Sequence, residues 1–122
     1  MATREIARER WSSELDAFSA HHAGWIVTLE VLGREFGEQP EANGLPLTGI
    51  VVESHQAAAR IAIMVGGRRD AHVTHIVEGP CRVWLREPDI ESDEAVEVEC
   101  DDGTRTLVYF GRLPAELQLT RS

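Results

Sequence analysis

The sequence contains no lysine, only two cysteines and no long apolar run. Its 12 basic residues, all arginine, are outnumbered by 21 aspartate and glutamate residues, which gives a formal net charge of −9. Proteins that hold nucleic acid neutralise several phosphates with clustered cations, and the only adjacent arginines here are Arg68 and Arg69. Nucleic acid is therefore not expected as a partner, and the same charge argument disfavours anionic membrane surfaces.

The apolar runs are far shorter than the about 20 residues that a membrane helix needs. The first eleven residues are charged and lack the apolar centre of a secretory signal, so we expect a cytoplasmic protein. Cys81 and Cys100 lie in separate alternating runs, which in that compartment favours two small buried hydrophobic residues over a disulfide. The length of 122 residues fits a single domain spanning 1–122 that folds without a metal or a disulfide.

Large apolar side chains recur at spacings of four and three from Trp11 to Phe18, which places them on one helical face. Either Ser12 or Ser13 can accept hydrogen bonds from the exposed amides of a first helical turn. These signals predict a helix over about residues 13–22.

His21 and His22 fall in the last turn of that helix, followed by Gly24. Free carbonyls at a helix C terminus favour a protonated imidazole, and glycine suits the left-handed position that ends a helix. We therefore interpret the two histidines as capping residues rather than as ligand or proton-transfer groups.

Apolar and polar residues alternate with a period of two through most of the remaining chain, which is typical of strands. The segment 34–44 contains a proline, two glycines and scattered charges, which predicts a loop. The three alanines before Ile61 could be helical on propensity, but the β-branched alternation that follows favours a hairpin with its tip near 55–59. The sequence thus predicts seven strands near 25–33, 47–53, 60–66, 72–77, 81–86, 95–100 and 106–110.

The clearest turn signal is the DDG triplet at 101–103, which suits a type I turn followed by a left-handed glycine. This three-residue loop would pair Cys100 with Thr104. A two-residue Asp-Gly turn would pair Val98 with Leu107 instead, so the register remains open between the two, with the first favoured.

One helix stripe and one sheet face have to bury each other. We therefore predict a mainly β (α+β) fold with the N-terminal helix packed on a small antiparallel sheet of six to seven strands. The sheet is expected to be strongly bent or a partly closed β-barrel over 25–110, with a C-terminal tail over 111–122.

Few residues suggest chemistry. His72 and His75 would chelate a metal together on a helix, but on a strand they point to opposite faces, which leaves only a distant partner such as His55. The chain has no phosphate-binding glycine loop, nucleophile elbow or HExxH pattern. The acidic residues between 89 and 99 match no calcium loop and suit a solvated edge. We therefore expect no catalytic residue, no cofactor and no metal.

One strand carries an unusual outward pattern. In CRVWLR the residues Arg82, Trp84 and Arg86 alternate with the apolar set of Cys81, Val83 and Leu85. Tryptophan and arginine are common anchors of protein interfaces, so these three residues are a candidate interaction surface. The alternative is that the helix or a loop covers the indole.

The order of these features resembles a bacterial domain family of unknown function. The resemblance is carried by a W-x-x-x-L-D-x-F-S helix at 11–19, GWIVTLEVLG at 24–33, GLPLTGIVV at 44–52, RIAIMVG at 60–66 and HVTHIVEGPCRVWL at 72–85. It covers almost the whole chain and implies no activity, cofactor or catalytic residue.

The preferred functional hypothesis is a non-enzymatic, acidic cytoplasmic module that assembles with itself or with another protein. The alternative is an enzyme or small-ligand-binding protein whose pocket lies near the 34–44 loop and uses His55, His72 or His75. A buried polar cluster in a concave pocket would favour the alternative, and a flat apolar patch would favour the interaction module.

Overall fold

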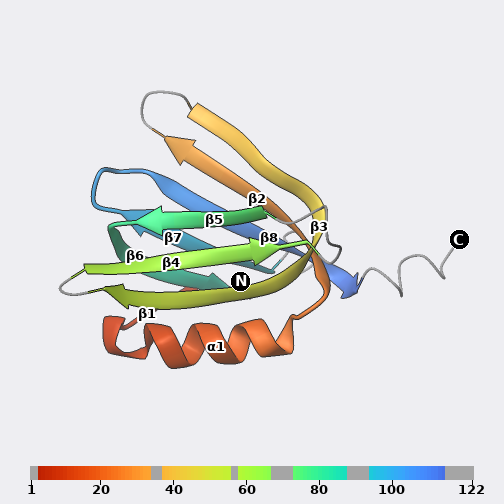
Figure 1. The fold of residues 1–122 in the computed structure, drawn as a ribbon, viewed down its shortest axis with the longest axis horizontal. Helices are drawn as coiled ribbons and strands as arrows, with labels where there is room; N and C mark the ends of the chain where they lie inside the picture. The colour runs from red at the N-terminus through yellow and green to blue at the C-terminus, as the bar shows by residue number, and fades with distance from the viewer. Residues whose placement is uncertain (1–2, 34–36, 56–57, 67–72, 88–93, 115–122) are drawn as a thin grey trace, which may run out of the picture.

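The structure is a computed structural model that describes residues 3–33, 37–55, 58–66, 73–87 and 94–114. Figure 1 shows one helix packed along a set of antiparallel strands. The elements follow in the order β1 (Thr3–Ile6), the short 3-10 helix η1 (Arg8–Arg10), α1 (Trp11–His21), β2 (Trp25–Gly33), β3 (Gly37–His55), β4 (Ala58–Val65), β5 (Val73–Glu78), β6 (Pro80–Arg86), β7 (Glu94–Cys100) and β8 (Arg105–Pro114).

The eight strands form one antiparallel sheet in the order β1-β6-β7-β8-β2-β3-β4-β5. The mainly β class with one N-terminal helix is therefore confirmed, but the prediction of a strongly bent or partly closed barrel is wrong. The two edge strands are β1 and β5, and closure would need them to pair, whereas in the described residues β1 pairs with β6 and β5 pairs with β4. The sheet still twists enough for β4 to contact β6 and for β5 to contact β7 across the interior.

Strand β1 was absent from the sequence prediction because it offers no alternating pattern. Only its last residue, Ile6, is buried, and the three residues before it are exposed. Its position is fixed by pairing with β6 far along the chain, so the sheet has eight strands rather than six or seven.

The predicted 34–44 loop is also wrong, because β3 starts at Gly37 and pairs with β2 in a long hairpin. That pairing has two register shifts, one between Val27 and Thr28 and one between Leu29 and Glu30, which accommodate the irregular sequence. Within the described residues, this part of β3 pairs with β2 alone. An edge position of this kind can accept Pro40, which has no backbone N–H to donate to a second neighbour. At the other end of the chain, β8 continues to Pro114, so the predicted tail does not begin at 111.

Both predicted hairpin tips are confirmed. The Cys100 amide donates to the carbonyl oxygen of Thr104 at 2.8 Å, and Gly103 has a φ of +90°. The three-residue loop is therefore the register that forms. The earlier hairpin joins β3 to β4 with His55 opposite Ala58, so its tip lies where the alternation placed it.

Helix α1 begins two residues earlier than predicted and without a serine cap. Its N-cap residue is Arg10, which makes no side-chain capping bond, because the 3-10 helix η1 leads directly into α1. The Trp11 indole Nε1 donates to the carbonyl oxygen of Ile6 at 2.9 Å and ties the helix start to β1. Gly24, with a φ of +85°, takes the predicted left-handed position. Among the described residues, no helix is long and apolar enough to cross a membrane.

The core lies on the inner face of the twisted sheet, where β4 meets β6 and β5 meets β7, and α1 packs against it beside β3. Helix α1 contacts β3 (Figure 1), and its stripe contributes two buried residues, with Phe18 partly buried beside them. The buried apolar cluster includes Trp11 and Leu15 together with Val27, Leu29, Leu47, Ile50, Ile61, Ile63, Val65, Val77, Val83, Val96, Val98, Val108 and Phe110.

A serine on α1 completes an open edge of β3. Strand β2 pairs with β3 only as far as Pro46, so the edge beyond it has no strand neighbour among the described residues. The Ser19 hydroxyl donates to the Ile50 carbonyl oxygen at 2.9 Å and accepts from the Ile50 amide at 2.8 Å. One side chain therefore satisfies both backbone groups that a neighbouring strand would otherwise pair.

Candidate functional site

Of the three histidines of the predicted pocket, His75 is the one whose side chain lies in the described part of the chain. His75 lies half-buried on β5, the side chain of His55 is outside the described residues, and so is all of His72. The side chains of 34–43 are also outside them. In the described ranges, no group of three or more His, Cys, Asp or Glu side chains could hold a metal ion. A pocket at 34–44 thus stays a prediction.

The residues of the candidate interaction surface lie on the sheet face away from the core. Val83 and Leu85 are buried in the core, whereas Arg82 is exposed and Trp84 and Arg86 are half-buried. Cys81 was expected to share the buried face, but it is exposed because the strand pairing shifts register between Pro80 and Arg82.

The outward side chains of β6, β7 and β8 form three rows, which we call the outer face. Strand pairing places them as Arg82-Glu99-Arg105, Trp84-Glu97-Leu107 and Arg86-Ala95-Tyr109. The Arg86 guanidinium lies 5.6 Å from the Tyr109 ring centre, and Arg105 Nη1 lies 3.3 Å from Glu97 Oε2. A hollow of about 130 Å³ beside the indole is lined by Thr3, Trp84, Arg86, Ala95, Glu97 and Leu107.

Helix α1 does not cover Trp84. The helix packs into the core on the opposite face, and the hollow beside the indole is lined by no residue of α1. The indole therefore remains accessible among the described residues, which is the arrangement that the interaction hypothesis requires.

A second site lies where α1 ends, centred on His22. The imidazole is 95 % buried, since its side chain keeps 5 % exposure. Its Nδ1 lies 2.9 Å from the Phe18 carbonyl oxygen, and its Nε2 lies 2.8 Å from Glu94 Oε1. The ring stacks on Phe18 with centroids 4.0 Å apart, and Phe110 lies 5.0 Å away.

The capping interpretation of the histidine pair is partly confirmed. His22 does bind a carbonyl of the last helical turn, whereas His21 is exposed. The contact with Glu94 was missed, because it joins positions 72 residues apart and no local pattern signals it.

The His22 pocket is a cavity of about 370 Å³ between α1, β1 and the facing ends of β6 and β7. It combines an apolar wall with groups of both charges. Its lining includes Arg4, Glu14, Phe18, His22, Leu85 and Glu94.

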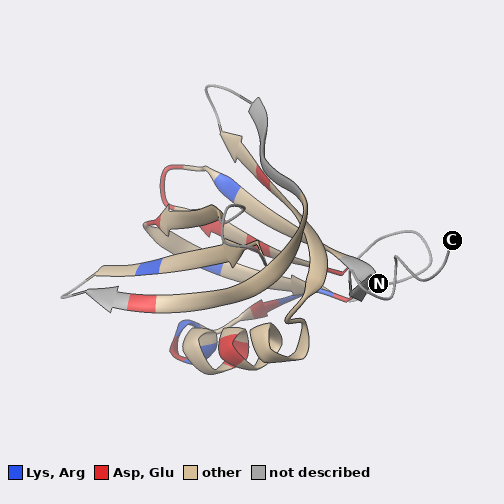
Figure 2. Ribbon diagram, turned by 45° about the vertical axis from the view of Figure 1, so that its right-hand side comes forward, with Lys and Arg blue, Asp and Glu red and all other residues tan. Residues whose placement is uncertain are grey.

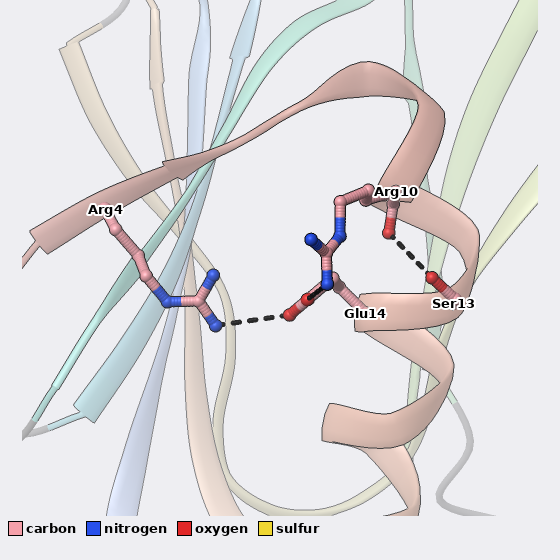
Figure 3. Close-up of polar contacts among 4 residues, drawn as sticks. All are labelled: Arg4, Arg10, Ser13 and Glu14. Carbon is pink, nitrogen blue, oxygen red and sulfur yellow. Dashed lines mark hydrogen bonds and ion pairs between the residues drawn. The ribbon is translucent and has the colours of Figure 1, made fainter.

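Two arginines converge on one carboxylate at the edge of this pocket (Figure 3). Arg4 Nη2 lies 3.2 Å from Glu14 Oε1, and Arg10 Nη2 lies 3.0 Å from Glu14 Oε2. Figure 2 shows basic and acidic segments side by side at the start of α1. The three groups together carry one unit of positive charge, which is notable in a chain of net charge −9.

The two cysteines differ in environment, although both are free thiols. Cys100 is buried, and burial is the main cause that raises the pKa of its thiol from 9.0 to about 11, with the nearby Asp102 charge as the next cause. Cys81 is exposed. Because the thiolate is the nucleophile, the two thiols should differ in reactivity.

A thiol-specific reagent at neutral pH is expected to modify one cysteine per native chain. Cys81 should react first, and Cys100 only after denaturant is added. Cys81→Ser should leave the native protein almost unreactive, which a mass measurement of the labelled chain checks. Equal labelling rates for both thiols in the native protein would contradict the buried position of Cys100.

Comparison with known proteins gives a family but no activity. A family model described as a family of unknown function, DUF5335, matches residues 2–119. An uncharacterized protein of Aquifex aeolicus (strain VF5) is 29 % identical over 108 residues, which cover 88 % of this chain and 91 % of that protein. No solved structure gives a significant match.

Proposed function

We propose that this chain, which belongs to the DUF5335 family of unknown function, is an interaction module that pairs with a second copy of itself through its outer face. Family membership brings no activity with it, so the proposal rests on the residues alone. The observation that carries it is the accessible Trp84 between two arginines on the face that α1 leaves uncovered.

Tryptophan and arginine are the side chains that most often dominate binding energy at protein interfaces. Here the indole borders a hollow of about 130 Å³ whose floor includes two buried apolar residues, Ala95 and Leu107. An inserted side chain from a partner would therefore displace water from an apolar surface while the arginines and carboxylates form a polar rim.

The arrangement of charges favours a second copy as the partner. On the outer face, β6 contributes Arg82 and Arg86, and the adjacent β7 contributes Glu97 and Glu99. A two-fold axis between these strands would place the arginine column of each copy opposite the carboxylate column of the other. Such a self-complementary patch is what a two-fold symmetric dimer requires.

The same proposal places the module in the cytoplasm and gives it no nucleic-acid partner. An exposed free thiol at Cys81 suits a reducing compartment. The net charge of −9 opposes binding to phosphate backbones.

Trp84→Ala is expected to weaken dimerisation about thirtyfold, because truncating an interface tryptophan typically costs about 2 kcal/mol. Sedimentation or light scattering over a concentration series measures this change. The free energy of unfolding, followed by urea denaturation, should fall by no more than about 1 kcal/mol, because Trp84 is outside the core.

Thr74→Ala serves as the control, since Thr74 is exposed on β5, at the opposite end of the strand order. It should leave the dimer unchanged. A wild-type protein that stays monomeric throughout the series would overturn the proposal, as would a dimer that Trp84→Ala leaves intact.

A further inference from the structure

The His22 pocket shares one of its described lining residues, Arg86, with the hollow on the outer face, and it has the composition of a ligand site. Its volume of about 370 Å³ lies within the range of small-molecule pockets, which starts near 300 Å³. We propose that it binds a small zwitterion of dipeptide size, with an ammonium group held by Glu94, a carboxylate held by Arg4 and an apolar body against Phe18 and Leu85.

Glu94 supplies the anionic end of the site. Its Oε1 receives the contact from His22 Nε2, which fixes the carboxylate. Its Oε2 accepts no hydrogen bond from the described residues, and the side chain keeps 20 % exposure. Both nitrogens of His22 are already engaged, so the imidazole positions Glu94 and does not bind the ligand itself.

Arg4 supplies the cationic end. Its side chain is 54 % exposed, and one of its five N–H groups contacts Glu14. Because Arg10 contacts the other oxygen of Glu14, that carboxylate is shared between two guanidiniums and does not neutralise both. Arg4 therefore retains donors and charge for a ligand carboxylate.

The spacing of the two ends selects the length of the ligand. Arg4 lies on β1 and Glu94 on β7, with β6 between them. The pairing sets Arg4 level with Val96, so the backbone of Glu94 is displaced from that of Arg4 by two strand spacings of about 4.8 Å and by two residues along the strand. A free α-amino acid carries its charges too close together to reach both ends well. The termini of a dipeptide are several bonds further apart, and its side chains can cover Phe18 and Leu85.

The test is calorimetric titration of the full chain with alanyl-leucine, N-acetyl-alanyl-leucine and alanyl-leucine amide. The free dipeptide is expected to bind at least about tenfold more tightly than either blocked form, because each blocked form loses one charged contact. Failure of the free dipeptide to bind at millimolar concentration would overturn the proposal. Equal affinity for all three probes would also overturn it, since it would show that the pocket does not recognise the ammonium and carboxylate termini of the dipeptide.

Two variants test the assigned residues. Glu94→Gln retains an oxygen for His22 but lacks the charge, so it should remove the preference for the free amine. Arg4→Gln should remove the preference for the free carboxylate, and Glu78→Gln on β5 is the matched control. Urea denaturation checks that each variant is folded. Unchanged preferences in both pocket variants would refute the assignment, and Arg4→Gln decides it alone if Glu94→Gln does not fold.

Discussion

Replacing Trp11 with alanine is expected to lower the free energy of unfolding by about 3–5 kcal/mol. The side chain is 97 % buried in the core beside Leu15, and the Arg8 guanidinium lies 5.0 Å from the indole ring. Its truncation opens a cavity and leaves the Ile6 carbonyl oxygen without the indole donor. Both losses fall on the junction between β1 and α1.

Urea denaturation of Trp11→Ala and Trp11→Phe separates the two contributions. The phenylalanine keeps most of the volume but cannot donate to Ile6, so it should cost about 1–3 kcal/mol. Trp84→Phe is the matched control on the outer face and should cost much less. If Trp11→Ala costs no more than that control, the helix start is not anchored as described.

The second large loss of stability is expected on replacing His22. His22→Ala should lower the free energy of unfolding by about 2–4 kcal/mol, because it removes a buried ring and two polar contacts together. The loss of the stacked ring also exposes Phe18 and Phe110. The helix end would then be held to β7 by neither the hydrogen bond nor the packing.

The adjacent histidine provides the control. His21 is exposed, so His21→Ala should change the free energy of unfolding by no more than about 0.5 kcal/mol. Chemical denaturation of the two variants compares the same substitution at neighbouring positions. Equal effects would mean that the burial of His22 contributes nothing to stability.

Features that local chemistry determines were predicted well from the sequence. The DDG signal favoured the register that β7 and β8 adopt, in which the Cys100 amide donates to the Thr104 carbonyl oxygen and Gly103 is left-handed. The stripe from Trp11 to Phe18 predicted the helix and its buried face. The family resemblance, carried by local motifs along the chain, is confirmed by the family model.

Features that depend on distant neighbours were not predictable in this way. Strand β1 forms because β6 has a free edge, not because four mostly exposed residues favour a strand. Cys81 is exposed because of a register shift that its own alternation does not reveal. The contact between His22 and Glu94 depends on a fold that brings the end of α1 beside β7.

The Ile50 amide donates to the Ser19 hydroxyl, so its hydrogen exchange should follow a different opening event from that of its neighbours. An amide bound within a strand pair exchanges when the strands separate, but this amide is bound to the helix. Its protection therefore reports how often α1 leaves the sheet. A single backbone position in the middle of β3 thus records helix undocking, while its neighbours in the same strand record the opening of the sheet.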